Sequence, residues 1–222
     1  MGKGKLKKFA ELDTFENTFQ PSREEVVEGL PMKGKWKSDV FKNDAPLILE
    51  LGCGRGEYSV ALAERYPECN FIGIDLKGAR IWEGAKKAIQ KDLDNVRFLR
   101  VQIELIEQCF AENEVDEIWI TFPDPQIKYK RTKHRMTNPW FLAKYRNVLK
   151  PGGIVHLKTD SEFLYGYTGG LLEMGEGKVL YSSADIYRVQ VRDEVLDIKT
   201  YYEKMWLEEG KAITYTKFVL SE

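Results

Sequence analysis

The sequence of 222 residues has few of the features that mark secreted or membrane-bound proteins. Its three cysteines are scattered and lack the spacing of a zinc site or a disulfide framework, which suits a reducing compartment. No apolar run is long enough to span a bilayer, and no hydrophobic signal region follows the basic amino terminus. The two histidines, His134 and His156, lack a cluster of further ligands. We therefore expect a cytoplasmic protein with neither a membrane nor a metal as partner.

Acidic residues are also missing between Pro125 and Thr159, although the formal net charge of the whole chain is only -1. This stretch is instead rich in basic side chains, which are Lys128, Lys130, Arg131, Lys133, Arg135, Lys144, Arg146, Lys150 and Lys158. A local positive field of this kind favours a polyanionic partner. Its first part also contains Tyr129, and we predict that it contacts RNA phosphates through Lys128, Lys130, Arg131, Lys133 and Arg135. A solvated basic loop is the alternative interpretation.

A hydrophobic content of 43% and an aromatic content of 12% indicate a globular protein. From residue 47 onward, short apolar runs alternate with segments of helical periodicity, which predicts a doubly wound α/β fold with a parallel sheet. The expected strands are 47–51, 71–75, 96–101, 117–122 and 154–158, and the expected helices are 57–65, 78–91, 103–110 and 139–149. The end of the chain reads as a strand-rich extension, with strands at 185–189 and 213–219 and a helix at 199–210.

The first part of the chain is expected to differ from the rest. Residues 1–8 are predicted to form a mobile basic arm, residues 22–30 a short helix capped by Ser22, and residues 31–46 a linker-like approach. The sequence therefore suggests an N-terminal arm and approach segment at 1–45, followed by a single α/β domain at 46–222.

The stretch from Leu47 to Tyr58 joins an expected strand to an expected helix through a loop with glycines at 52, 54 and 56. Glycines let the backbone approach a ligand closely, so Gly52 and Gly54 predict a cofactor loop. A dinucleotide pyrophosphate would be repelled by Glu50 beside this loop, whereas the ammonium and sulfonium of S-adenosylmethionine would be attracted. Asp75, about 20 residues further on at the end of the next strand, is placed to hold ribose hydroxyls.

Ligands of open α/β sheets bind at the carboxyl ends of the strands, and this rule selects further residues. The third strand leads to Gln102, whose amide suits an adenine edge, although an ordinary polar residue at a strand end is an equally good interpretation. The fourth leads to Phe122-Pro123-Asp124-Pro125, in which two prolines stiffen the backbone around Asp124. That carboxylate is suited either to hold the edge of a base or to stabilise positive charge that develops during reaction, and both roles stay open. The fifth strand leads to Thr159-Asp160.

These motifs together resemble the bacterial tRNA (guanine-N7)-methyltransferase family. The resemblance is carried by Leu-Glu-Leu-Gly-Cys-Gly-Arg-Gly at 49–56 and Phe-Pro-Asp-Pro at 122–125, with further matches at 16–21, 73–75, 156–160 and 200–203. It implies a Rossmann-like S-adenosylmethionine-dependent fold in which Glu50, Asp75, Gln102 and Asp124 line the cofactor and reaction site. It also implies that the tRNA guanosine, at position 46 of the variable loop, is engaged by Lys128, Asp160, Thr200, Tyr201, Tyr202 and Glu203.

The sequence departs from the family pattern at several positions. Gln126 stands where the family usually has Trp, and Arg131-Thr132 where paired histidines are common. Asp75 replaces a more frequent Glu, and Gln102 replaces Asp or Asn. The last two changes keep a polar side chain, whereas Gln126 affects the expected loop conformation.

The chemistry of guanine N7 suits such a site, because N7 carries a lone pair and no proton, so its methylation needs alignment rather than a general base. Two alternatives remain at this point: a methyltransferase acting on an exocyclic base amine, and a non-catalytic RNA-binding protein on a methyltransferase fold. Both a monomer and a homodimer are compatible with the sequence.

Overall fold

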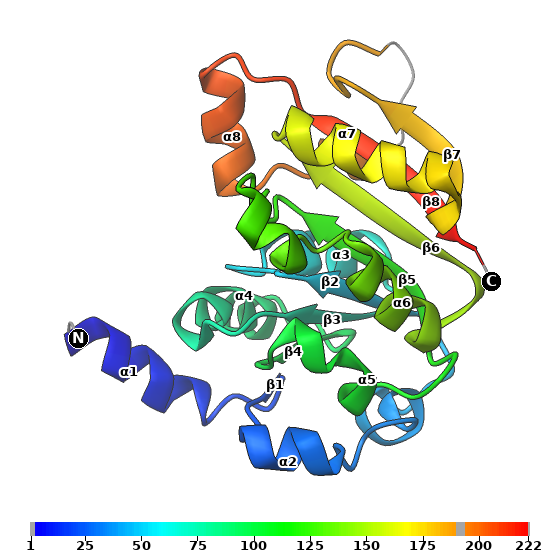
Figure 1. Cartoon of the computed structure of the whole chain (residues 1–222). Coiled ribbons are helices and arrows are strands. Elements are labelled where there is room, and N and C mark those ends of the chain that lie inside the picture. Colours follow the sequence, from blue (N-terminus) through cyan, green and yellow to red (C-terminus); the bar gives the residue numbers. More distant parts are fainter. Residues whose placement is uncertain (1–2, 190–193, 222) are drawn as a thin grey trace.

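The structure, a computed structural model, describes residues 3–189 and 194–221. Eight strands form a single sheet in the order β1-β4-β3-β2-β5-β6-β8-β7 (Figure 1). Their bounds are β1 Thr18–Phe19, β2 Leu47–Leu51, β3 Asn70–Ile74, β4 Val96–Leu99, β5 Val115–Thr121, β6 Leu149–Thr159, β7 Gly177–Ser183 and β8 Thr214–Leu220. Strands β1 to β6 pair in parallel, and this confirms the predicted doubly wound sheet. The order of the strands reverses between β2 and β5.

Helices cover both faces of this sheet, as Figure 1 shows. The helices are α1 Lys3–Leu12, α2 Arg23–Glu28, α3 Glu57–Arg65, α4 Gly78–Gln90, α5 Ile106–Cys109, α6 Pro139–Val148, α7 Glu162–Leu171 and α8 Tyr201–Glu208. One buried cluster lies beneath α2, α5, α6 and α7, and a second beneath α1, α3 and α4. Because β2 and β3 are covered on both sides, every residue in them is buried, and their sequences are mainly apolar rather than alternating.

The carboxyl-terminal strands belong to the main sheet. The sequence predicted a strand-rich extension but not that its strands pair with β6. Strand β8 runs antiparallel to β6, with His156 opposite Lys217, and β7 is antiparallel to β8. The prediction of a strand at 185–189 was wrong, because the strand lies earlier, at Gly177–Ser183. At 185–188, Asp185 Oδ1 accepts a hydrogen bond from Tyr187 N at 3.0 Å, and Asp185 O accepts one from Arg188 N. Such Asp-based turns compete with strand pairing.

The amino-terminal segment is more ordered than predicted. The expected mobile arm is helical from Lys3, and Lys8 Nζ lies 3.0 Å from Glu83 Oε1 and 4.4 Å from the centroid of Trp82, both in α4. The approach segment is also anchored, because Trp36 is fully buried and its indole nitrogen donates to Cys109 O at 2.9 Å. Both α1, through Lys8, and the approach segment, through Trp36, therefore contact the α/β core, although the predicted domain boundary at 45 and 46 stays a prediction.

Candidate active site

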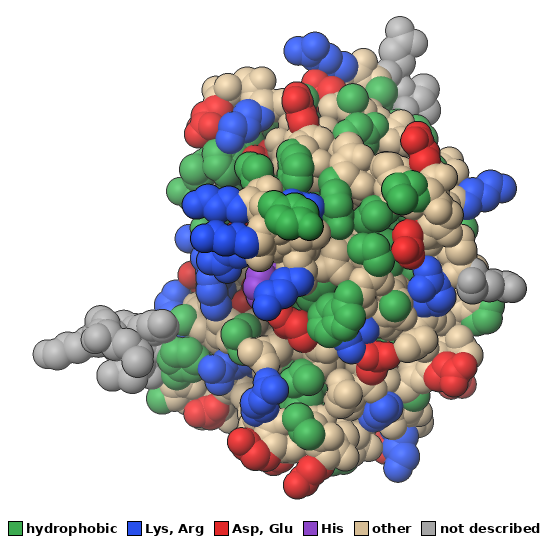
Figure 2. Space-filling model, in the orientation of Figure 1, with side chains coloured by type: hydrophobic (Ala, Val, Ile, Leu, Met, Phe, Trp, Pro, Cys, Tyr) green, Lys and Arg blue, Asp and Glu red, His purple; other side chains and the backbone are tan. Residues whose placement is uncertain are grey.

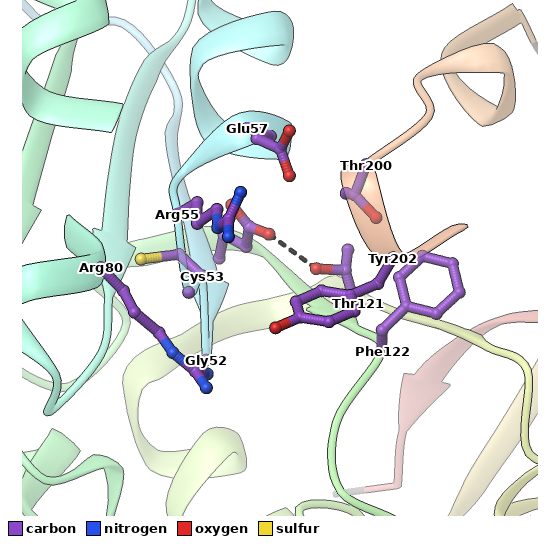
Figure 3. Close-up of a pocket in the computed structure, with 11 residues that line it drawn as sticks. Gly52, Cys53, Arg55, Glu57, Arg80, Thr121, Phe122, Thr200 and Tyr202 are labelled. Carbon is purple, nitrogen blue, oxygen red and sulfur yellow. Dashed lines mark hydrogen bonds between the residues drawn. The ribbon is translucent and has the colours of Figure 1, made fainter. Parts of the chain in front are cut away.

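The loops that follow β2 and β5 enclose a hollow of about 490 Å³ at the point where the strand order reverses. This is the position at which open α/β sheets bind their ligands. In Figure 3 the residues of the glycine loop lie on one side of the hollow, and Thr121, Phe122, Thr200 and Tyr202 lie on the other. The full lining comprises Glu50, Gly52, Cys53, Gly54, Arg55, Glu57, Arg80, Thr121, Phe122, Thr200 and Tyr202.

The glycine loop after β2 needs its glycines. Gly52, Gly54 and Gly56 have φ values of 76°, 55° and 66°, a region that side chains rarely tolerate. A Cβ atom at Gly56 would lie 2.5 Å from Phe98 Cε1, so this glycine also permits close packing against β4. The amides of Gly52 and Cys53 donate to Ile74 O at 2.8 and 3.0 Å, which fastens the loop to the end of β3. The loop is thus fixed in place, and the absence of side chains at Gly52 and Gly54 leaves its backbone accessible from the hollow.

Glu50 supplies a buried carboxyl group to this hollow. Its Oε2 accepts hydrogen bonds from the amide (2.8 Å) and the hydroxyl of Ser59, and its Oε1 accepts one from Thr121 Oγ1 at 2.6 Å. Burial disfavours the charged form and raises the pKa of Glu50 to about 7, against the lowering effect of these hydrogen bonds. A cation in the hollow would favour the ionised form, so the site is suited to a positively charged ligand.

Asp75, directly after β3, contacts the glycine loop that borders this hollow. Its carboxylate accepts from Gly54 N at 3.0 Å, in the glycine loop, and from Lys77 N at 2.7 Å. The next residue, Leu76, lines the second hollow of about 700 Å³, together with Val101 and Gln102. Gln102 Oε1 accepts from Arg23 Nη1 at 2.5 Å, so the start of α2 closes this side. The acid and the amide thus follow neighbouring strands, but they do not share a hollow with Glu50: Gln102 lines the second hollow, and Asp75 lines neither.

These residues fit S-adenosylmethionine. The first hollow combines a carboxyl group with open backbone, Asp75 is bonded to Gly54 of the first hollow and precedes Leu76 of the second, and the second hollow pairs apolar Leu76 and Val101 with an amide. An elongated ligand with a cationic end, a ribose and an adenine requires this sequence of groups. Arg55, Arg80 and Thr121 also line the first hollow and were not among the predicted residues. No spacing rule singles out these residues, since Arg55 lies in the glycine loop, Arg80 in the first turn of α4 and Thr121 at the end of β5.

Asp124 lies in a third hollow of about 640 Å³, which Pro125, Gln126, Ile127, Lys128 and Arg131 also line. The carboxylate is exposed, and its Oδ1 accepts from Gln126 N at 3.1 Å. On either side, Phe122 and Gln126 have positive φ values of 48° and 47°. Residues other than glycine adopt this conformation at a cost of about 1–3 kcal/mol, and such strain clusters at functional sites. The strained backbone on both sides of Asp124 is a feature that the prolines alone did not predict, and the rigid placement of its carboxylate stays a prediction.

The basic loop after Asp124 forms a short 3-10 helix at Tyr129–His134. Lys128, Lys130, Arg131 and Lys133 are exposed on it, and the described residues place no carboxylate within ion-pair distance of these four cations. In Figure 2, blue side chains gather along the left edge of the molecule, over the loop that leaves β5 in Figure 1. Four of the five predicted RNA-contacting residues are therefore available to a polyanion.

Arg135, the fifth of these residues, does not fit the prediction of an RNA contact. Only 6% of its surface is exposed. Its guanidinium donates to Gln126 O and Ile127 O, each at 3.2 Å, and lies 4.8 and 4.5 Å from the ring centroids of Phe163 and Tyr167 in α7. Arg135 therefore holds the basic loop from inside, and a charge count along the sequence cannot separate it from its exposed neighbours.

The predicted substrate segment at 200–203 divides into two parts. Thr200 and Tyr202 line the first hollow, and Tyr201 N donates to Glu57 Oε2 at 3.0 Å. Glu203 instead has no exposed surface; its Oε1 lies 2.8 Å from Lys158 Nζ and accepts from the Tyr187 hydroxyl at 2.7 Å. Its carboxylate is thus directed into the protein rather than into the hollow. Asp160, at the end of β6, is partly exposed and lies 3.7 Å from Lys211 Nζ.

The described residues offer neither a metal site nor a membrane span. They contain no group of three or more His, Cys, Asp or Glu side chains that could hold a metal ion. Among the same residues, no helix has the length and apolar character needed to cross a bilayer.

Comparison with known proteins agrees with this geometry. A family model described as "Putative methyltransferase" matches residues 44–216. A tRNA (guanine-N(7)-)-methyltransferase of Christiangramia forsetii is 61% identical over 219 residues, which cover 97% of each chain. A protein of the same name from Bacteroides fragilis is 48% identical over 224 residues, covering 100% of this chain and 88% of the relative.

Among solved structures, the 16S rRNA methyltransferase KamB has a TM-score of 0.61 at 14% identity, covering 80% of this chain and 88% of its own. An S-adenosylmethionine-dependent methyltransferase from Aquifex aeolicus has a TM-score of 0.55 at 18% identity, covering 100% of both chains. At these identities the likeness concerns the fold, and it confirms the predicted Rossmann-like methyltransferase architecture.

Proposed function

Because the chain belongs to the family of tRNA (guanine-N(7)-)-methyltransferases, we propose that it methylates N7 of guanine in tRNA, with S-adenosylmethionine as the methyl donor in the first hollow and the guanine in the hollow beside Asp124. One observation carries this proposal. Phe122 lines the cofactor hollow, and Asp124, two residues later, lines the hollow that opens beneath the basic loop. A donor in the first hollow and a base in the second would therefore meet across the same short, strained turn.

The residues of the chain act mainly by alignment. S-adenosylmethionine, when bound, supplies an electrophilic methyl group. Guanine N7 attacks through its own lone pair, so no residue has to remove a proton from it. Asp124 either orients the base or stabilises the positive charge that the ring gains, and its turn fixes the direction of the carboxylate. Lys128, in the same hollow, is placed to contact the phosphate or sugar of the target nucleotide.

The cofactor is held by residues from three strand ends. We assign Glu50 to its cationic end, Asp75 to the ribose, Gln102 to the adenine, and the backbone of Gly52 and Gly54 to the wall of the hollow. Arg80 lines the same hollow, and its charge suits the carboxylate of the methionine part. Asp160, Thr200, Tyr201 and Tyr202 are proposed to border the nucleoside. The proposed cellular location is the cytoplasm, where tRNA is found.

The target nucleotide is proposed to be guanosine 46 of the variable loop, as the family resemblance implies. The test incubates unmodified tRNA transcripts with the pure protein and labelled S-adenosylmethionine, and maps methylated N7 by its sensitivity to reduction and strand cleavage. Cleavage at guanosine 46, and its absence from a transcript with adenosine at 46, would support the proposal. Label at an exocyclic amine would favour the alternative enzyme, and cofactor binding without transfer would leave only an RNA-binding role.

The raised pKa of Glu50 predicts a pH-dependent affinity for S-adenosylmethionine. The cationic ligand favours ionised Glu50, so binding below pH 7 must release the proton that this carboxyl holds in the free protein. The affinity is expected to rise with pH up to about 7 and to level off above it. Calorimetric titration on either side of pH 7, in buffers of different ionisation enthalpy, measures both the affinity and the proton release.

Glu50→Gln is the control for this experiment, because titration of the ligand itself persists in the variant while the contribution of Glu50 disappears. The variant is expected to bind more weakly and to release fewer protons. Identical pH profiles for both proteins would show that Glu50 does not face the cationic end of the ligand.

The exposed cations of the basic loop predict a salt-dependent effect on tRNA binding. Changing Lys128, Lys130, Arg131 and Lys133 to Gln should weaken tRNA binding and reduce the salt slope by about one unit per lost phosphate contact. The measurement is tRNA affinity at several salt concentrations, with S-adenosylmethionine affinity expected to stay unchanged. The matched control changes four exposed lysines from other parts of the chain, which are Lys35, Lys42, Lys87 and Lys178. Equal salt slopes for the two quadruple variants would place the RNA on another surface.

A further inference from the structure

A fully buried ion pair lies behind the cofactor hollow. Lys158, near the end of β6, and Glu203, in the first turn of α8, have side chains without exposed surface, and Lys158 Nζ lies 2.8 Å from Glu203 Oε1. Burial lowers the pKa of Lys158, and the charge of Glu203 opposes this shift. Because burying two charges costs several kcal/mol per ion, such a pair is weak evidence for stability, and one of its attested uses is to fix a single arrangement.

The hydrogen bonds of Lys158 show what this pair fixes. Besides Glu203, Lys158 Nζ donates to Leu196 O at 3.0 Å and to Ile198 O at 2.9 Å. All three acceptors belong to the segment 196–203, which leads into α8. The remaining bond of the carboxylate comes from the Tyr187 hydroxyl, at 2.7 Å. One lysine on the central sheet thus anchors the segment at three points.

The same segment also rests on the residues that follow the glycine loop. Tyr58 donates its hydroxyl to Val195 O at 3.1 Å, and Tyr201 N donates to Glu57 Oε2 at 3.0 Å. The guanidinium of Arg55 lies 4.9 Å from the ring centroid of Tyr201. The anchors at Lys158 and at α3 therefore enclose the positions from which Thr200 and Tyr202 face the glycine loop in Figure 3.

We propose that Lys158 and Glu203 are positioning residues that hold segment 195–203 across the cofactor hollow, so that Thr200 and Tyr202 close it. Glu203 then acts through Lys158 and does not grip the guanine itself. The inference rests on the proposed function only in taking S-adenosylmethionine as the ligand of this hollow. It has a consequence that a guanine contact would not have: loss of either partner weakens cofactor binding when no tRNA is present.

The experiment measures S-adenosylmethionine affinity by calorimetry, without tRNA and well below the melting temperature of each protein. Lys158→Met and Glu203→Gln are each expected to weaken binding about tenfold, which corresponds to a segment in place in one molecule in ten. Together they should weaken it by less than the product of the two effects, because both remove the same interaction. If a single variant folds poorly, Lys158→Met with Glu203→Met removes both charges and avoids a buried unpaired one.

Lys144→Met is the matched control, since it breaks the partly buried pair of Lys144 with Glu107 between α6 and α5. It should leave cofactor affinity unchanged even where it lowers the melting temperature. Wild-type cofactor affinity in Glu203→Gln, together with lost methyl transfer, would overturn the inference and indicate that Glu203 contacts the guanine instead. Unchanged affinity in Lys158→Met would also overturn it. Failure of the proposed function is separate, since it would appear as absent tRNA methylation by the wild-type protein.

Discussion

Asp124→Asn is expected to slow single-turnover methyl transfer to unmodified tRNA by about a hundredfold or more. The substitution keeps the shape of the side chain and removes its charge, so it weakens either the grip on the base edge or the stabilisation of charge that develops on the ring. A small misplacement of reacting atoms alone can cost about a hundredfold in rate. Because phosphate contacts dominate tRNA affinity, the dissociation constant for tRNA should change little.

The control for this prediction is Asp94→Asn, an exposed acid just before β4 and thus at the opposite end of the strands from the site. It should transfer the methyl group at the wild-type rate. A near-normal rate for Asp124→Asn would mean that the turn at 122–126 is strained for a structural reason, and that other residues align the base.

Asp75→Ala should give the second large effect, a weakening of S-adenosylmethionine binding by about 1.5–3 kcal/mol, the range for hydrogen bonds that involve a charged group. The carboxylate lies at the end of β3, where it is proposed to hold the ribose, and it also steadies the glycine loop through Gly54 N. Loss of the ribose contact and loss of the hydrogen bond to Gly54 N both weaken cofactor binding. Calorimetric titration measures the affinity, and circular dichroism shows whether the sheet survives.

Asp44→Ala, at an exposed position before β2, is the matched control and should bind the cofactor normally. The fold of Asp75→Ala is expected to persist, because residue 75 lies outside the two buried clusters. Wild-type affinity in the folded variant would remove Asp75 from the site and leave the ribose to other groups.

The sequence determined those parts of the protein whose causes are local. An apolar run, three glycines and a helical pattern can only be connected as strand, tight loop and helix, so β2, the cofactor loop and α3 were predicted within a residue or so. Glu50 and Asp75 follow from the same logic, because an acid in the last two residues of a parallel strand or directly after it must lie near the carboxyl edge of the sheet. The Phe-Pro-Asp-Pro motif specified the family, which the relatives confirm.

Tertiary structure decided the features that depend on partners distant in the chain. Arg135 and Arg131 look alike in sequence, yet one is buried against α7 and the other exposed, because only the fold brings Phe163 and Tyr167 beneath the loop. In the sequence, Glu203 looks like any residue of an amphipathic helix. Only the fold shows that it pairs with Lys158, 45 positions earlier. Likewise, the order in which β8 inserts between β6 and β7 follows from pairing across the sheet, and periodicity within a segment carries no information about its neighbours.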